Sequence, residues 1–212
     1  MLSKLIQWFA AATLLFSVTA HAEFQAGQHY KVLPQAVTVP ADGRVHVEEA
    51  FWYGCPHCFR LEDVITPWKK TLPADVQFSG VPAMFGRAWV AHAQLYHVAD
   101  VLGVLEQMHT PIFRAINLER QPLLSRGDQR DFLVSKAGVS ESDFDKAYES
   151  FAVKTRMKQA DQRIRAFGIN GVPALIVQGK YVVDSGSAGG MEAMLRVVDH
   201  LIAVERAALK GK

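Results

Sequence analysis

A Cys-x-x-Cys pair between an apolar strand and a helix constrains this chain more than any other feature. Residues 55–58 read Cys-Pro-His-Cys, and the chain contains no other cysteine. The preceding segment, 45–52, has the composition of a buried strand. Pro56 suits the first turn of a helix, where its missing N–H costs no hydrogen bond. The pattern therefore predicts Cys55 at a strand-to-helix junction and Cys58 one turn inside a helix.

The spacing of this pair indicates redox chemistry. A disulfide stabilises a fold mainly by closing a long loop in the unfolded chain, and this loop is minimal. Such a pair can instead exchange, because one sulfur attacks a partner and the other resolves the mixed disulfide. Unpaired N–H groups and the dipole of a helix N-terminus favour a Cys55 thiolate. His57 adds a charged or hydrogen-bonding ring, and Cys58 is expected to be the buried resolving thiol.

Other uses of the two cysteines are less well supported. A zinc site usually takes four ligands, and neither a second Cys-x-x-Cys nor a His-x-x-x-His is present. Haem attachment requires a histidine directly after the second cysteine, where this chain has Phe59. An inert structural pair stays open as an alternative. We predict no metal and no cofactor, and we expect five other histidines to be surface or capping residues: His46, His92, His97, His109 and His200.

The first residues have the pattern of a secretory signal peptide. Lys4 precedes a mostly apolar segment, 5–18, and Ala20-His21-Ala22 is a small-x-small cleavage pattern. The apolar segment is shorter than the roughly 20 residues of a membrane-spanning helix. We expect cleavage after Ala22 and export to an oxidising compartment, where disulfides persist. The remaining chain is close to neutral, which disfavours nucleic-acid binding.

Two α/β segments flank a helical block. Strands are predicted at 45–52, 76–81, 174–177 and 181–184, the last two forming a hairpin. Helices are predicted at 56–71, 88–102, 104–117, 127–137, after Ser140, at 153–167 and at 191–208, with a glycine-rich turn at 185–190. This order predicts an α/β domain interrupted by an all-helical one.

The segments 51–58 (Phe-Trp-Tyr-Gly-Cys-Pro-His-Cys) and 171–173 (Gly-Val-Pro), with the helices between them, resemble the DsbA family of periplasmic thiol:disulfide interchange proteins. The resemblance covers essentially the whole chain after the signal peptide. Cys-Pro-His-Cys is specific within the thioredoxin superfamily, because reducing thioredoxins typically have Gly-Pro between the cysteines. The resemblance implies an α/β, thioredoxin-like fold with an inserted helical domain. The expected division is 1–22 signal peptide, 23–86 with 161–212 thioredoxin-like domain, and 87–160 helical insert.

The resemblance also implies roles for individual residues. Cys55 becomes the nucleophile, Cys58 its disulfide partner and His57 the stabiliser of the thiolate, while Pro56 sets the turn. Pro173 becomes a cis-proline beside the cysteines. We expect the Val172 backbone to bind extended substrates by strand addition.

Glu49 is a candidate for modulating the thiol pKa. It occupies the place, six residues before the first cysteine, where the family often has a buried acid. It shares a strand face with apolar residues, which supports burial, although a solvated strand-end carboxylate is the alternative. The family's best-known member pairs this acid with a lysine on the next strand. The matching position here is Gly80, so the sequence supplies no such partner.

The expected function is that of a periplasmic dithiol oxidase. The protein would donate its disulfide to reduced exported polypeptides and be reoxidised by a quinone-linked membrane protein like DsbB, acting as a monomer. A disulfide isomerase or reductase is the alternative, although such isomerases usually carry an extra N-terminal dimerisation domain. A thiol-independent chaperone is a further alternative. Trp52, Tyr53 and Phe59 flank the motif, either in the core or as an apolar rim suited to unfolded substrates.

Overall fold

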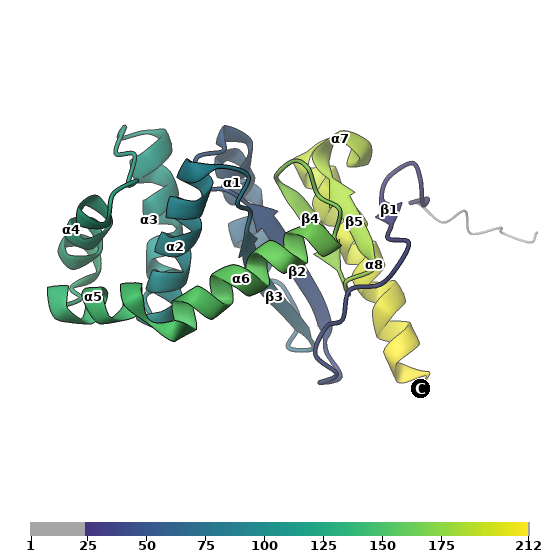
Figure 1. The fold of residues 1–212 in the computed structure, drawn as a ribbon. Coiled ribbons are helices and arrows are strands. Elements are labelled where there is room, and N and C mark those ends of the chain that lie inside the picture. Colours follow the sequence, from purple (N-terminus) through teal and green to yellow (C-terminus); the bar gives the residue numbers. More distant parts are fainter. Residues whose placement is uncertain (1–23, 212) are drawn as a thin grey trace, which may run out of the picture.

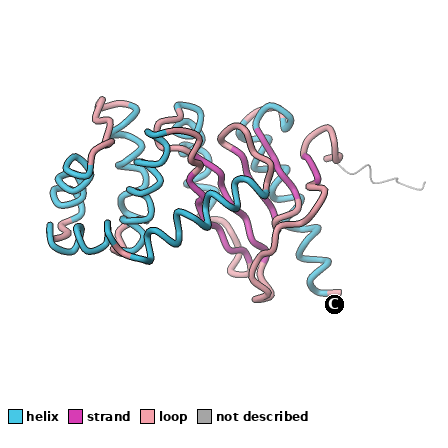
Figure 2. The backbone as a smooth tube through the Cα atoms, in the orientation of Figure 1, coloured by secondary structure: helices cyan, strands magenta, loops and turns pink. Residues whose placement is uncertain are grey.

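A five-stranded mixed sheet forms the centre of the protein (Figures 1 and 2). The computed structural model describes residues 24–211, so the predicted signal peptide lies outside the described residues. The strands are β1 (Lys31–Val32), β2 (Val45–Phe51), β3 (Val76–Pro82), β4 (Ala174–Val177) and β5 (Tyr181–Asp184). Their order in the sheet is β1-β5-β4-β2-β3, with β3 parallel to β2 and the other neighbours antiparallel. The predicted hairpin is therefore confirmed as β4–β5.

Helices cover both faces of the sheet and extend from one side of it. They are α1 (Pro56–Lys69), α2 (Arg87–Val101), α3 (Leu105–Asn117), α4 (Arg126–Ala137), α5 (Glu141–Glu149), α6 (Phe151–Ala166), α7 (Ser185–Ala188) and α8 (Met191–Lys210). Figure 1 shows α6 crossing one face of the sheet and α8 lying on the other. Helices α2 to α5 form the block beside the sheet, in agreement with the predicted helical insert.

The alternation of side chains along β2 explains how the layers assemble. Val45 and Val47 pack with α1 and α8, whereas Ala50 packs with α6 on the opposite face. Phe51, at the end of the strand, belongs to a third apolar cluster that contains both cysteines and residues of α2 to α5. Because that cluster joins the sheet to the helical block, the cysteines lie where the two parts of the molecule meet.

Three local features differ from the sequence prediction. β1 is an unpredicted edge strand of 2 residues, too short to have a periodic pattern. The predicted turn after β5 contains α7, because the Asp184 carboxylate caps the N–H groups of Gly186 and Ser187. The predicted domain boundary between 160 and 161 falls inside α6, and the division of the chain into domains stays a prediction. No helix within residues 24–211 is long and apolar enough to cross a membrane.

Candidate active site at the N-terminus of α1

The turn between β2 and α1 places the Cys-Pro-His-Cys segment at the start of a helix. Gly54 is required in this turn, since a Cβ atom there would lie 2.4 Å from the Trp52 ring. Cys55 is the N-cap residue of α1, and Pro56 occupies the first helical position, as predicted. The Cys55 Sγ accepts the Cys58 N–H at 3.4 Å. The sulfur therefore occupies the place that a capping oxygen fills in other helices.

The two sulfurs have opposite environments. Cys55 is 8% exposed and Cys58 is fully buried, and both are free thiols in this structure. Donation by the Cys58 side chain and by the backbone N–H groups of Cys58 and His57 lowers the Cys55 pKa from 9.0 to about 6, against the opposing effect of burial. Burial raises the Cys58 pKa, and the hydrogen bond to Cys55 raises it further. One sulfur is thus an accessible thiolate at neutral pH, and the other keeps its proton.

His57 is exposed and acts on Cys55 through both its backbone and its ring. Its N–H donates toward the sulfur, and the charge of its ring makes the smallest of the contributions that lower the Cys55 pKa. The guanidinium of Arg60 lies 2.7 Å from His57 Nδ1. Arg60 was not singled out from the sequence, although its i, i+3 spacing from His57 on a helix is a recognisable signal.

The segment before β4 lies against the cysteines. The Val172–Pro173 peptide bond is cis, as expected, and the Cys55 Sγ lies 3.7 Å from the Val172 carbonyl oxygen, to which its thiol form donates. These residues are 117 positions apart in sequence, and only the β2–β4 pairing brings them together. Beside them is a groove of about 450 Å³ lined by His57, residues 167–174 and the start of α7. The groove places the exposed residues Asn170 and Gly171 beside His57 of the Cys-Pro-His-Cys segment.

Aromatic side chains lie next to the dithiol. Tyr53 is buried in the core, whereas Trp52 and Phe59 are half-buried. The Trp52 ring stacks on Trp89 of α2 with centroids 4.2 Å apart, and Phe85 packs against Trp89 while remaining 47% exposed. Of the three aromatic residues near the motif, only Tyr53 is therefore purely a core residue.

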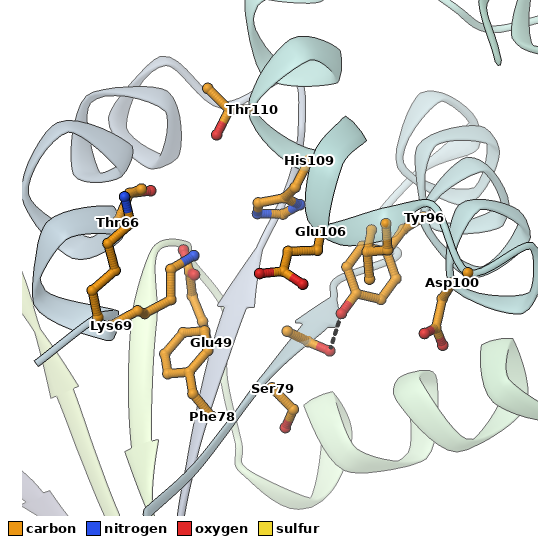
Figure 3. A pocket seen from close by; sticks show the side chains of 14 residues that line it. Glu49, Thr66, Lys69, Phe78, Ser79, Tyr96, Asp100, Glu106, His109 and Thr110 are labelled. Atoms are coloured by element: carbon orange, nitrogen blue, oxygen red, sulfur yellow. Dashed lines mark hydrogen bonds between the residues drawn. The ribbon is translucent and has the colours of Figure 1, made fainter. Parts of the chain in front are cut away.

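Glu49 is buried, as predicted, and faces a cavity on the side of the sheet covered by α1. The residue is 1% exposed, and burial together with the nearby Glu62 raises its pKa from 4.5 to about 8, opposed by Lys69. Figure 3 shows its carboxyl group turned into a cavity of about 810 Å³ between α1, β3, α2 and α3. Glu49 is therefore protonated at neutral pH.

Comparison with known proteins agrees with this geometry. A family model described as the DSBA-like thioredoxin domain matches residues 65–196, a match that begins just after the dithiol. The curated protein "Thiol:disulfide interchange protein DsbA" of Pseudomonas syringae pv. tomato is 44% identical over 94% of this chain and 94% of its own length. Its counterpart in Pseudomonas aeruginosa is 42% identical over 94% and 95%. The chain belongs to the DsbA family.

Solved structures of DsbA proteins have the same fold. The crystal structure of Pseudomonas aeruginosa DsbA has a TM-score of 0.84 and 42% identity, covering 90% of this chain and 98% of that one. The oxidoreductase DsbA from Xylella fastidiosa has a TM-score of 0.81 and 31% identity, covering 86% and 98%. The prediction of a thioredoxin-like α/β fold with inserted helices is confirmed, and the protein is a thiol:disulfide oxidoreductase.

This DsbA-family chain departs from the expected acid–lysine pair on β2 and β3. Glu49 is directly opposite Gly80 in the sheet register, as the sequence indicated. A Cβ atom at Gly80 would lie 2.8 Å from the Tyr96 hydroxyl, which donates to the Gly80 carbonyl at 3.1 Å. Tyr96 thus occupies the space beside β3. The cation that lowers the pKa of Glu49 is instead Lys69 of α1.

The prediction that the other histidines are surface or capping residues is wrong for four of them. His46, His92 and His97 are buried, and the His109 side chain is only 14% exposed. A helix or strand face of mixed polarity does not distinguish a buried histidine from an exposed one, because the neutral ring is compatible with either setting. No cluster of metal-ligating side chains is found among residues 24–211.

Proposed function

We propose that the protein is a periplasmic dithiol oxidase that donates the Cys55–Cys58 disulfide to reduced cysteines of exported polypeptides. The observation that carries this proposal is the contrast between the two sulfurs. An acidic, accessible Cys55 beside a buried, protonated Cys58 stabilises the reduced form, so the disulfide is readily given away.

The exchange proceeds in two steps. A substrate thiolate attacks the Cys55 sulfur, the Cys55–Cys58 bond breaks, and Cys58 leaves as a thiolate that takes up a proton. A second substrate thiolate then attacks the first substrate sulfur, and Cys55 leaves as the stabilised thiolate. Two electrons pass from the substrate dithiol to the protein, which is left reduced. A quinone-linked membrane protein similar to DsbB then accepts those electrons and restores the disulfide.

The remaining site residues take supporting roles in this proposal. His57 stabilises the thiolate, and Pro56 sets the helix start. The Val172–Pro173 segment binds extended substrate backbone, a role supported by the 3.7 Å contact between Val172 and Cys55. Glu49, buried and protonated, keeps a negative charge away from Cys58, whose pKa an ionised Glu49 would raise further. The protein acts as a monomer, after export and cleavage behind Ala22.

The redox potential of the dithiol tests the oxidase proposal. Equilibrating the protein with glutathione mixtures should give a potential more oxidising than the about −180 mV of a disulfide isomerase. A value near the about −270 mV of thioredoxin would identify a reductase instead.

A second measurement separates the oxidase from a chaperone. The wild type should form the disulfide of a reduced two-cysteine peptide stoichiometrically, and Cys55→Ser should not. Suppression of aggregation that is equal in wild type and Cys55→Ser, without peptide oxidation by either, would assign a chaperone.

A further inference from the structure

A buried carboxylate lies one helical turn from Cys58 and takes no part in the exchange steps above. Glu62 of α1 is 4% exposed. Its Oε2 accepts hydrogen bonds from the hydroxyls of Thr66 at 3.1 Å and Thr110 at 3.2 Å. Donors from two helices, α1 and α3, therefore converge on this oxygen, and hydrogen bonds to a carboxylate favour its charged form.

His109 of α3 faces the other oxygen of Glu62. Its Nε2 lies 3.7 Å from Glu62 Oε1, and its Nδ1 lies 2.8 Å from the Tyr53 hydroxyl. Burial lowers the pKa of His109 to about 3 and holds the pKa of Tyr53 well above its ordinary value, so both groups are neutral at pH 7.

The hydrogen bond to Tyr53 favours one tautomer of the imidazole. In the described part of the chain, His109 Nδ1 is the one hydrogen-bond partner of the Tyr53 hydroxyl, so the tautomer that uses the hydroxyl proton has Tyr53 donating to Nδ1. The proton of the neutral ring is then on Nε2 and points toward Glu62. At 3.7 Å this is a charge–dipole contact rather than a hydrogen bond. Within the described residues, Glu62 Oε1 has no hydrogen-bond partner.

Glu49 has none of this support. Its Oε1 is buried without a hydrogen-bond partner among residues 24–211, and the charge of Glu62 acts on it. Because the charge of Glu62 disfavours a second negative charge, Glu49 is the carboxyl that retains a proton. The other ionisable side chains that line the cavity in front of Glu49 and His109 are Lys69, Lys70, Tyr96, Asp100 and Glu106 (Figure 3). Asp100 is paired with Arg156.

We propose that His109 is a positioning residue for thiol–disulfide exchange: its Nε2–H, oriented by Tyr53, keeps the negative charge of the buried carboxyl pair on Glu62 and the proton on Glu49. The proposal rests on the proposed function, because Cys58 gains or loses a proton in every exchange cycle and an ionised Glu49 would raise the pKa of Cys58. His109 touches neither sulfur and acts only through Glu62.

Site-resolved titration tests this placement of the proton. Carboxyl ¹³C signals of the reduced protein are assigned with Glu49→Gln and Glu62→Gln. At pH 6.5 the wild type should show the proton of the pair on Glu49. His109→Leu removes the dipole but keeps the hydrogen bonds from Thr66 and Thr110, so part of the proton should move from Glu49 to Glu62 and the two signals should shift toward each other. Unchanged protonation of each carboxyl in a folded His109→Leu protein would overturn the proposal.

Two further variants separate charge placement from packing. His109→Gln should restore the wild-type pattern, because an amide can accept from Tyr53 and donate to Glu62. Tyr53→Phe keeps the aromatic ring but frees the tautomer of His109, and should shift the proton as His109→Leu does. Tyr53→Phe also provides the test if the His109→Leu protein does not fold. His97→Leu is the control, because it removes another buried imidazole whose nitrogens make no hydrogen bond to any described residue.

The pH profile of disulfide reduction by glutathione tests the link to exchange. It should shift in His109→Leu and Tyr53→Phe and match wild type in His109→Gln and His97→Leu. If the protonation of the carboxyls changes in His109→Leu but the pH profile of disulfide reduction does not, the positioning role is overturned. Failure of the wild type to oxidise a reduced peptide would instead refute the proposed function, and the carboxyl titration, which needs no substrate, would still report where the proton is.

Discussion

Cys55 owes its acidity to several donors that meet at one sulfur. The Cys58 thiol contributes most, followed by two backbone N–H groups of the first helical turn and then by the charge of His57. None of these interactions is strong by itself. Their sum exceeds the cost of burial because all of them converge on the same atom, at the end of a helix whose dipole has the matching sign.

We expect the Cys55 thiol to titrate near pH 6 in the reduced protein. The rate of alkylation by iodoacetamide, followed against pH, measures this directly. Because the folded pKa is lowered, the stabilisation of the reduced protein is fully present above the unfolded value of about 8.5 and is lost as pH falls through about 6. An alkylation midpoint above pH 8 would contradict the assignment.

The relative size of the contributions to the Cys55 pKa predicts which of two variants changes that pKa more. Cys58→Ala removes the largest donor to the Cys55 sulfur, whereas His57→Ser removes only the charge of the ring and leaves the backbone N–H in place. Both should raise the Cys55 pKa, and Cys58→Ala should raise it more. Alkylation profiles of the two variants decide the point. A larger rise in His57→Ser would mean that the His57 ring, helped by Arg60, is the main stabiliser.

At the scale of single elements, β2 and β3 are shaped by the helix that packs on them. Tyr96 of α2 reaches the backbone of β3 because position 80 has no side chain. A lysine at this position, as in the family's best-known member, would have to displace that ring. The close approach of α2 to the sheet therefore depends on a residue without a side chain at position 80, which leaves no room for a cation there.

Gly80→Ala should destabilise the protein by about 1–3 kcal/mol, because the new Cβ would lie 2.8 Å from the Tyr96 hydroxyl and 3.1 Å from the Phe51 ring. Urea unfolding monitored by circular dichroism measures the loss. Gly127→Ala in α4 is the matched control, since its nearest neighbour is the Ser125 hydroxyl at 3.8 Å. That change should be neutral or stabilising by up to about 1 kcal/mol. Equal stability of the two variants would show that α2 can move away freely.

At the scale of the whole molecule, buried neutral histidines make the fold sensitive to acid. Burial lowers the pKa of His97 to about 4 and that of His109 to about 3. The unfolded chain binds protons at these residues below about pH 6.5, while the folded protein does not. Stability from these groups is therefore lost as pH falls from about 6.5 toward 4. Glu49 acts in the opposite direction, since its raised pKa penalises the folded state as pH rises toward 8.

His97→Leu should make stability less dependent on pH between 7 and 5. Urea midpoints of wild type and variant at both pH values give the comparison, and the difference between them removes the effect of Glu49. His200→Leu, which changes a half-buried histidine on α8, is the control and should behave as the wild type does. Identical pH dependence in wild type and His97→Leu would mean that His97 is hydrated in solution.

The sequence alone determined the strand–turn–helix at Cys55, the hairpin and the helical block, and it favoured the burial of Glu49 without deciding it. Each of these predictions depends on the spacing of apolar residues along a helix or strand, or on the conformational limits of proline and glycine. Such signals act over a few residues. The histidine prediction failed because burial of a neutral ring depends on what packs over it. The tertiary structure alone decided which residues meet: Val172 with Cys55, Tyr96 with Gly80, and His109 with Tyr53 and Glu62. These pairs lie on different elements, and contacts of that kind follow from the packing of layers rather than from any pattern within one segment.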